Sequence, residues 1–181
     1  MKHVALLRGI NVGGKNMLPM KDLARMFTQA GCRDVVTYIQ SGNVVFHAPA
    51  PLLKRLPAVI SAKIAEDFGH SVPVVLRSHE ELETVIRGNP FPEAVQQEKT
   101  LYVAFLAAAP SAEAIAKLDP QRSPPDRFVV AGRDMYLHLL NHAAKTKLTN
   151  AWMDSKLSTV STARNWATIL KLHEMTRPGS V

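Results

Sequence analysis

Apolar residues recur with two different periods along residues 3–78, and these periods predict alternating strands and helices. Alternating, β-rich runs occupy residues 3–7, two stretches of residues 34–48 around Ser41–Gly42, and residues 71–78. Helical spacing covers residues 19–31 and 51–69, and each of these segments ends at a glycine. The resulting order, strand, helix, strand, strand, helix, strand, is that of a ferredoxin-like (βαββαβ) unit.

The same order begins again after a helical link over residues 79–98. Strand, helix and hairpin patterns follow at residues 99–107, 111–119 and 126–140, and two helices are expected at residues 146–157 and 162–175. This half shows no pattern for a fourth strand. We therefore predict the α+β fold class, with two ferredoxin-like (βαββαβ) subdomains over residues 1–78 and 99–181, the second irregular and carrying C-terminal helices. Packing of both as one domain is compatible with this pattern.

Length and composition indicate a globular protein. The 181 residues, 46% of them hydrophobic, are enough for one sizeable core or two small ones. No apolar run reaches the roughly 18 residues of a membrane helix, and Arg8 interrupts the first apolar stretch too early for a signal peptide. We expect a cytoplasmic protein with no membrane partner. The single cysteine, Cys32, has no metal-binding spacing around it, so we expect a small buried residue and no metal.

The net charge of +7 is concentrated near the two ends of the chain. Residues 2–25 hold five Lys or Arg against one Asp, and residues 145–177 hold six against two acidic residues. The central residues 33–134 are nearly balanced, with eleven basic and twelve acidic residues. This polarity favours an anionic partner, either a phosphorylated small molecule or nucleic acid, although basic residues also simply solubilise exposed helices.

The stretch "RGINVGGKN", residues 8–16, reads literally as a phosphate-binding GxxxxGK loop after a strand. Three observations argue against a nucleotide-hydrolysing P-loop. Asn16 replaces the magnesium-binding hydroxyl, Pro19 would fall inside the helix that follows, and the hairpins imply an antiparallel sheet.

An anion site in another fold remains open for the same loop. Gly13 and Gly14 can turn backbone N–H groups to one side, and Arg8 and Lys15 add positive charge. The helix beginning near Pro19 lacks a capping residue, a gap that Asn16 or a bound anion would fill. The alternative is that the glycines only supply unusual backbone angles.

Two further segments carry candidate residues. In a βαββαβ sheet the third strand lies beside the first, so Gln40, Ser41 and Asn43 are expected at the same rim as the glycine loop. In residues 161–172, Thr162 is expected to cap a helix with Arg164 and Asn165 in its first turn. A cation near a helix N-terminus opposes the helix dipole, so Arg164 is expected to face an anion. That anion is an anionic ligand or, equally, a carboxylate of the protein itself.

Several stretches, in this order, closely resemble a bacterial family known as domain of unknown function 1697. They are "ALLRGINVGGKNMLPM", "TYIQSGNVVF", "VPVVLRS", "NPF" and "TARNWATILKL", and the resemblance covers essentially the whole chain. It implies an α+β fold with two ferredoxin-like subdomains and implies no particular activity. Ala163 and Ala167 depart from the family's usual Thr-Thr-Arg-Asn-Trp-Asn. The matching motif positions, marked without a role, are Arg8, Gly9, Asn11, Gly13, Gly14, Lys15, Gln40, Ser41, Gly42, Asn43, Arg164, Asn165 and Trp166.

Three classes of function are compatible with these patterns. The first is a module that binds an anionic small molecule or nucleic acid through Arg8, Asn11, Gly13, Gly14, Lys15, Asn16, Gln40, Ser41, Asn43, Arg164 and Asn165. The second is an enzyme acting on a phosphorylated or carboxylated metabolite with an acid or base that the sequence does not identify. The third is a structural or partner-binding protein. Catalytic residues, cofactors and oligomeric state stay open.

Overall fold

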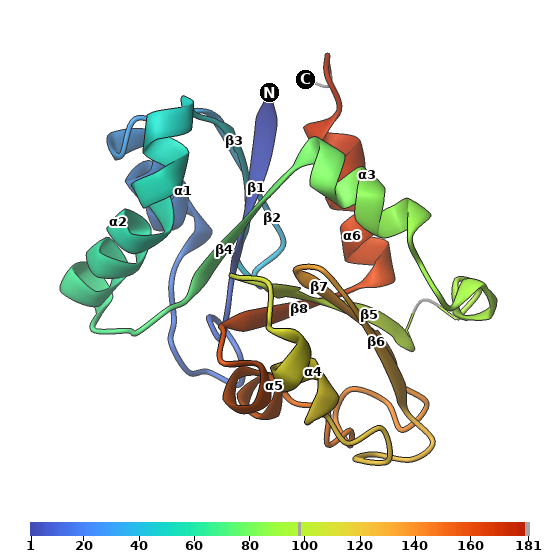
Figure 1. The fold of residues 1–181 in the computed structure, drawn as a ribbon. Helices are drawn as coiled ribbons and strands as arrows, with labels where there is room; N and C mark the ends of the chain where they lie inside the picture. Colours follow the sequence, from blue (N-terminus) through green and yellow to red (C-terminus); the bar gives the residue numbers. More distant parts are fainter. Residues whose placement is uncertain (98, 180–181) are drawn as a thin grey trace. The chain divides into compact units, whose positions relative to one another are not determined.

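Two four-stranded sheets with the same topology form the framework of the fold (Figure 1). The structure is a computed structural model that describes residues 1–97 and 99–179. The first sheet has the order β2-β3-β1-β4 and the second the order β6-β7-β5-β8, and every neighbouring pair is antiparallel. The strands are β1 (Lys2–Leu7), β2 (Arg33–Tyr38), β3 (Asn43–His47), β4 (Val74–Ser78), β5 (Leu101–Leu106), β6 (Arg127–Ala131), β7 (Asp134–His138) and β8 (Ser161–Asn165). The predicted α+β fold class with ferredoxin-like subdomains is confirmed.

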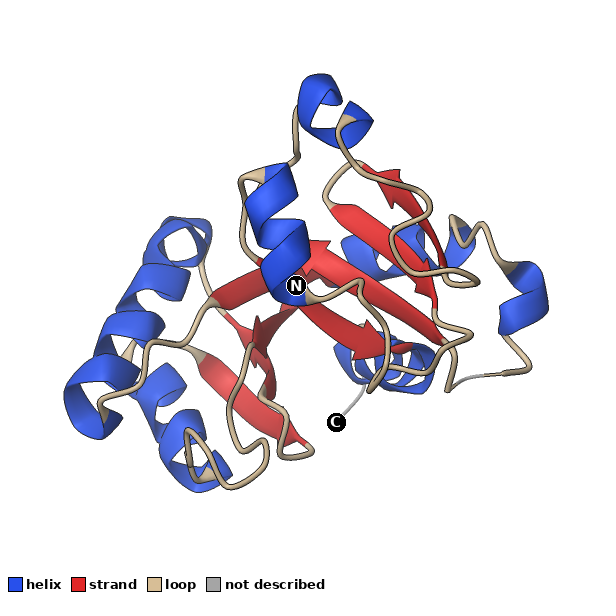
Figure 2. Cartoon of the chain, turned by 90° about the horizontal axis from the view of Figure 1, so that it is seen from below, coloured by secondary structure: helices blue, strands red, loops and turns tan. Residues whose placement is uncertain are grey.

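The helices complete both βαββαβ patterns. Figure 2 shows helices in blue and strands in red. They are α1 (Met20–Gln29), α2 (Ala50–Phe68), α3 (His79–Arg87), the 3-10 helix η1 (Pro92–Ala94), α4 (Ala112–Ala116), α5 (Asn150–Leu157) and α6 (Trp166–Thr176). The chain forms two compact units, residues 1–83 with 172–179, and the segment 84–171. The expected domain boundaries at residues 78 and 98 stay a prediction. Within the described residues, no helix is both long and apolar enough to cross a membrane.

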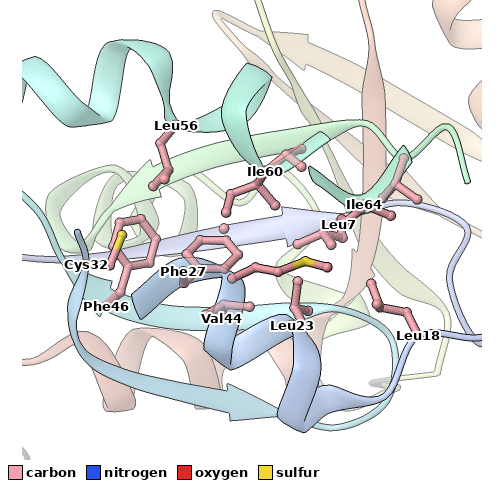
Figure 3. Close-up of a cluster of buried hydrophobic side chains, with 14 of the residues drawn as sticks. Leu7, Leu18, Leu23, Phe27, Cys32, Val44, Phe46, Leu56, Ile60 and Ile64 are labelled. Carbon is pink, nitrogen blue, oxygen red and sulfur yellow. The ribbon is translucent and has the colours of Figure 1, made fainter. Parts of the chain in front are cut away.

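The core of the first unit lies between its sheet and the helices α1 and α2 (Figure 3). Phe27 of α1 and Phe46 of β3 have ring centroids 5.3 Å apart, as expected for aromatic residues that face each other across a core. Cys32 is buried in this cluster, and burial raises its pKa to about 11. This thiol therefore behaves as a small apolar side chain, as its sequence context predicts.

The second unit has its own core between its sheet and the helices α4 and α5. β5 contributes Ala104 and Leu106, and α5 contributes Met153 and Leu157. The α5 helix begins at Asn150, later than the predicted residue 146, and the Thr149 hydroxyl accepts a hydrogen bond from Trp152 N at 3.2 Å to cap it. In each unit, therefore, one face of the sheet packs against helices of the same unit through apolar side chains.

The second half does contain a fourth strand, contrary to the prediction. Residues 161–165 form β8, and Thr162 pairs with Phe105 of β5 instead of capping a helix. The helical pattern is real but starts at Trp166, and Asn165 Oδ1 accepts a hydrogen bond from Thr168 N at 2.9 Å in its first turn. The strand was hidden because its buried positions carry Ser161, Thr162 and Arg164, so the usual apolar alternation is absent.

Candidate functional site

The glycine-rich loop is a miniature hairpin, which we call the glycine hairpin (residues 11–16). Val12 and Lys15 form an isolated antiparallel bridge, and Lys15 N donates to Val12 O at 3.0 Å. Gly13 and Gly14 between them have φ angles of 57° and 73°. Two positive φ angles in a two-residue loop are characteristic of a type I′ turn, where glycine is favoured. The glycines are therefore required by the turn whether or not a ligand binds.

The Asn11 side chain joins the glycine hairpin to the turn that follows β2. Its Oδ1 accepts a hydrogen bond from Leu18 N at 2.8 Å, while Nδ2 donates to Leu18 O at 2.9 Å and to Gln40 O at 3.0 Å. Leu7 N also donates to Gly42 O at 2.8 Å, because β1 and β3 are adjacent. Residues 8–16 and 39–42 thus form one continuous surface, which we call the basic rim.

The outer part of the basic rim is exposed. Lys15 and Gln40 are exposed and Arg8 is half-buried, so two cations lie on the rim. A Cβ atom added at Gly13 or Gly14 would meet nothing within 4 Å, which indicates open space around this turn. The apolar side chains Val12, Met17 and Ile39 are 64%, 58% and 49% exposed. The rim therefore projects, and offers positive charge and apolar surface together.

Other predicted residues of the rim have a structural part in it. Asn43 is fully buried, and its Nδ2 donates to Tyr38 O at 3.0 Å and to Ser41 Oγ at 3.1 Å, which closes the β2–β3 turn. Asn16 Nδ2 donates to Gly9 O at 2.8 Å, so Asn16 does not cap α1, contrary to one expectation. The residue before α1 is Pro19, which has no side chain able to accept a capping hydrogen bond.

Arg164 and Asn165 lie in the second unit, whereas the basic rim lies in the first. Arg164 is buried in β8 and not in the first turn of a helix, contrary to the prediction. Its Nη1 donates to Thr162 Oγ1 at 3.0 Å and to Ala163 O at 2.8 Å, and burial lowers its pKa to about 10. Trp166 is buried.

Three polar residues of the first unit that no sequence motif predicts, Asp34, His47 and His79, make defined side-chain contacts. His47 Nδ1 lies 2.9 Å from Asp34 Oδ2, and His79 Nδ1 lies 3.0 Å from Thr176 Oγ1. These residues are far apart in the sequence and match no spacing motif, so only the fold reveals them. Among the residues that the structure describes, no group of three or more His, Cys, Asp or Glu side chains is suited to a metal ion.

We expect Asn11→Asp to lower the free energy of unfolding by about 2 kcal/mol, because it removes both Nδ2 hydrogen bonds and places a carboxylate against two carbonyl oxygens. Chemical denaturation of the purified protein measures this. Asn16→Asp is the matched control, since Asn16 has a similar φ of 49° but donates one exposed bond, and its cost should stay below about 1 kcal/mol. Equal losses would contradict the joining role of Asn11.

Comparison with known proteins gives a family and a fold. A family model described as "Protein of unknown function (DUF1697)" matches residues 1–136, a range that includes the basic rim. The chain is similar to a solved structure described as conserved bacterial protein SP0830 from Streptococcus pneumoniae, with a TM-score of 0.71 and 21% sequence identity. That similarity covers 97% of this chain and 98% of the other, and at this identity it shows the fold alone. No curated protein matches the chain.

Proposed function

Since the chain belongs to the DUF1697 family, which carries no assigned activity, its function has to be argued from its own residues, and we propose that it binds an anionic ligand at the basic rim. Nucleic acid is the ligand class that we favour. Arg8 and Lys15 would supply charge, the exposed N–H groups around Gly13 and Gly14 would approach phosphate oxygens, and Gln40 would add a polar contact.

The observation that carries this proposal is the linkage made by Asn11. Its hydrogen bonds to Leu18 and Gln40 give the glycine hairpin a defined position beside the neighbouring turn. A preorganised polar surface loses less conformational entropy on binding than a flexible loop does. This fixed position supports a recognition surface more than a passive connection between β1 and α1.

Exposure of the rim favours an extended polyanion over a nucleotide. Small-molecule sites are concave and bury most of their ligand, whereas the glycine hairpin projects with open space around Gly13 and Gly14. The exposed Val12, Met17 and Ile39 offer apolar contacts that bases or sugars can use beside the phosphate contacts. The chain also has a net charge of +7. Steering of a polyanion by this charge would raise the association rate.

Not every basic residue near the N-terminus serves this surface. Lys2 lies at the opposite end of β1, where its Nζ donates to Met175 O at 3.2 Å. Arg25 of α1 pairs with Asp22 at 2.8 Å. Only Arg8 and Lys15 belong to the rim itself, so we expect affinity in the range of nonspecific nucleic-acid binding.

We expect Lys15→Ala to weaken binding of a fluorescent single-stranded oligonucleotide of about 20 nucleotides several-fold, and to reduce the slope of log K against log salt by about one. Fluorescence anisotropy between about 50 and 200 mM salt measures both quantities. Lys54→Ala is the control, because Lys54 is an exposed lysine of α2 outside the rim. Each variant lowers the net charge of the protein by one, so the comparison between them separates the local effect of Lys15 from the overall electrostatic field.

Three results would decide against the proposal as stated. Absence of oligonucleotide and ATP binding would reject an anion site, and equal effects of the two lysine variants would reject this location. Binding of ATP with a shallow salt dependence, together with no oligonucleotide binding, would replace nucleic acid by a small anionic ligand.

A further inference from the structure

A separate cavity of about 840 Å³ lies in the first unit, at the opposite end of β1 from the basic rim. Its volume is within the range of about 300–1,000 Å³ that is typical of small-molecule sites. Residues of β1, β2, β3, α3 and α6 line it, so its wall is built by several elements. These features fit a small-molecule site better than a flat docking surface.

Apolar side chains make up the larger part of the cavity wall, and they come from Val35 and Val36 of β2, Val45 of β3 and Met175 of α6. Val36 and Val45 are register partners on neighbouring strands, so their side chains lie on the same face of the sheet. Val36 is nevertheless 50% exposed. A ligand with an apolar body would remove this surface from water, which favours binding.

The charged groups on the cavity wall balance one another. Asp34 and Glu80 are negative, and Lys2 and the α-amino group of Met1 are positive. The three charged side chains also have partners within the chain. Asp34 Oδ2 lies 2.9 Å from His47 Nδ1, Lys2 Nζ donates to a backbone carbonyl oxygen at 3.2 Å, and Glu80 is engaged as well. A charged ligand would lose hydration here without neutralising a net opposite charge, so the wall favours an uncharged ligand.

Two imidazole rings on the wall, those of His47 and His79, each keep one nitrogen for a ligand. His47 Nδ1 contacts Asp34, and His79 Nδ1 lies 3.0 Å from Thr176 Oγ1. Among the residues that the structure describes, neither Nε2 atom has a hydrogen-bond partner. A neutral imidazole has one donor and one acceptor nitrogen, whereas a hydroxyl group can both donate and accept. A ligand hydroxyl therefore suits Nε2 whichever ring nitrogen carries the proton.

We propose that this cavity binds an uncharged small molecule with an apolar body and a hydroxyl group, such as a medium-chain alcohol. The body packs on Val36 and Val45, and the hydroxyl group pairs with His47 or His79. This inference is independent of the proposed function, because the basic rim prefers anions and lies at the other end of β1. Lys15→Ala should therefore leave binding in the cavity unchanged.

Displacement of N-phenyl-1-naphthylamine, an uncharged dye that becomes more fluorescent in apolar surroundings, tests the charge preference. Octanol, octylamine and octanoate, which share one alkyl chain, are the competitors. Octanol is expected to displace the dye at a concentration at least about tenfold lower than either charged compound, because neither charge is compensated by the balanced wall. Displacement by octylamine or octanoate at the same concentration as octanol would overturn the preference for an uncharged ligand.

The location is tested by Val36→Asp, which should weaken dye binding at least about tenfold because it places a carboxylate in the apolar wall. Val59→Asp is the matched control, since Val59 is an exposed valine of α2 that does not line the cavity, and it should bind the dye like the wild-type protein. Circular dichroism checks that each variant folds, and Val36→Thr, which keeps the β-branched shape, should also weaken binding. No dye binding by the wild-type protein, or unchanged binding in a folded Val36 variant, would overturn the site itself.

The hydroxyl contact is tested by the double variant His47→Phe and His79→Phe. The octanol concentration needed for displacement should rise several-fold, whereas the dye, which has no hydroxyl group, should bind at least as tightly as before. An unchanged octanol requirement would overturn the contact between the hydroxyl group and the imidazole rings.

Discussion

Gly42→Ala is expected to lower the free energy of unfolding by about 3 kcal/mol, through backbone strain and overpacking together. Gly42 has a φ of 84°, which L-amino acids with a Cβ atom adopt only at a cost. The added Cβ would also lie 2.7 Å from Leu7 Cβ and 2.9 Å from Ile10 Cδ1, at the buried inner side of the basic rim. Urea denaturation followed by circular dichroism measures the loss.

Gly69→Ala separates the two causes. Gly69 has a similar φ of 71° at the end of α2, but a Cβ atom there would meet nothing within 4 Å. We expect this control to cost about 1 kcal/mol, the conformational part alone. If Gly42→Ala cost no more than Gly69→Ala, the close approach of Leu7 and Ile10 to this turn would be wrong. Oligonucleotide binding by Gly42→Ala should also weaken, because the turn carries one side of the rim.

Asp126→Ala is expected to lower the free energy of unfolding by about 4 kcal/mol, because it leaves one buried donor, on Ser123, and two half-buried donors, on Asn141 and Thr146, without an acceptor. The buried carboxylate accepts hydrogen bonds from Ser123 Oγ at 2.8 Å, Asn141 N at 2.7 Å and Thr146 Oγ1 at 2.7 Å. These bonds hold residues 139–149 of the second unit to the segment before β6. Thermal and urea denaturation of the variant measure the loss.

The Asp126 carboxylate also makes the free energy of unfolding depend on pH in the acidic range. Burial by itself raises the pKa of Asp126, but the hydrogen bonds from Asn141, Thr146 and Ser123 outweigh it and hold the pKa below the ordinary value of 3.8. Its contribution is therefore complete above pH 3.8 and is lost as the pH falls through the folded-state pKa. Asp126→Asn should flatten this part of the profile. An unchanged profile in that variant would contradict the assignment.

A control for Asp126 comes from a carboxylate in the same segment. Asp119 Oδ1 accepts one exposed hydrogen bond, from Gln121 N at 2.9 Å. Asp119→Ala should therefore cost below about 1 kcal/mol and leave the acid dependence unchanged. A loss as large as that of Asp126→Ala would mean that burial of the Asp126 network does not set its contribution.

Local patterns were sufficient for most of the fold. The helices α1 and α2 and the hairpin formed by β6 and β7 follow from periodicity and from glycines at turns. The prediction failed at β8, because three of its five residues, Ser161, Thr162 and Arg164, are polar and yet buried. Their polar groups are satisfied by hydrogen bonds, so the strand carries no alternation of apolar residues. Periodicity of hydrophobic residues cannot detect such a strand.

For the basic rim, the sequence predicted which loops lie together but not what each side chain does. The βαββαβ order was enough to predict that the glycine loop and the turn after β2 lie at one edge, since the third strand pairs with the first. The order of strands and helices could not predict that the three asparagines of this region form different hydrogen bonds. Asn11 joins the two loops, Asn16 closes the hairpin on Gly9, and Asn43 is buried inside a turn.

Except for β8, residue order alone therefore determined the sequence of strands and helices, the antiparallel pairing and the concentration of glycine and positive charge after the first strand. These features depend on local periodicity and on the rules of chain connection. The tertiary structure decided which polar side chains hold the loops together and which line a cavity. Asp34, His47 and His79 come from distant parts of the chain and meet around one cavity. Hydrogen-bond partners and burial depend on distances in space, which no short stretch of sequence contains.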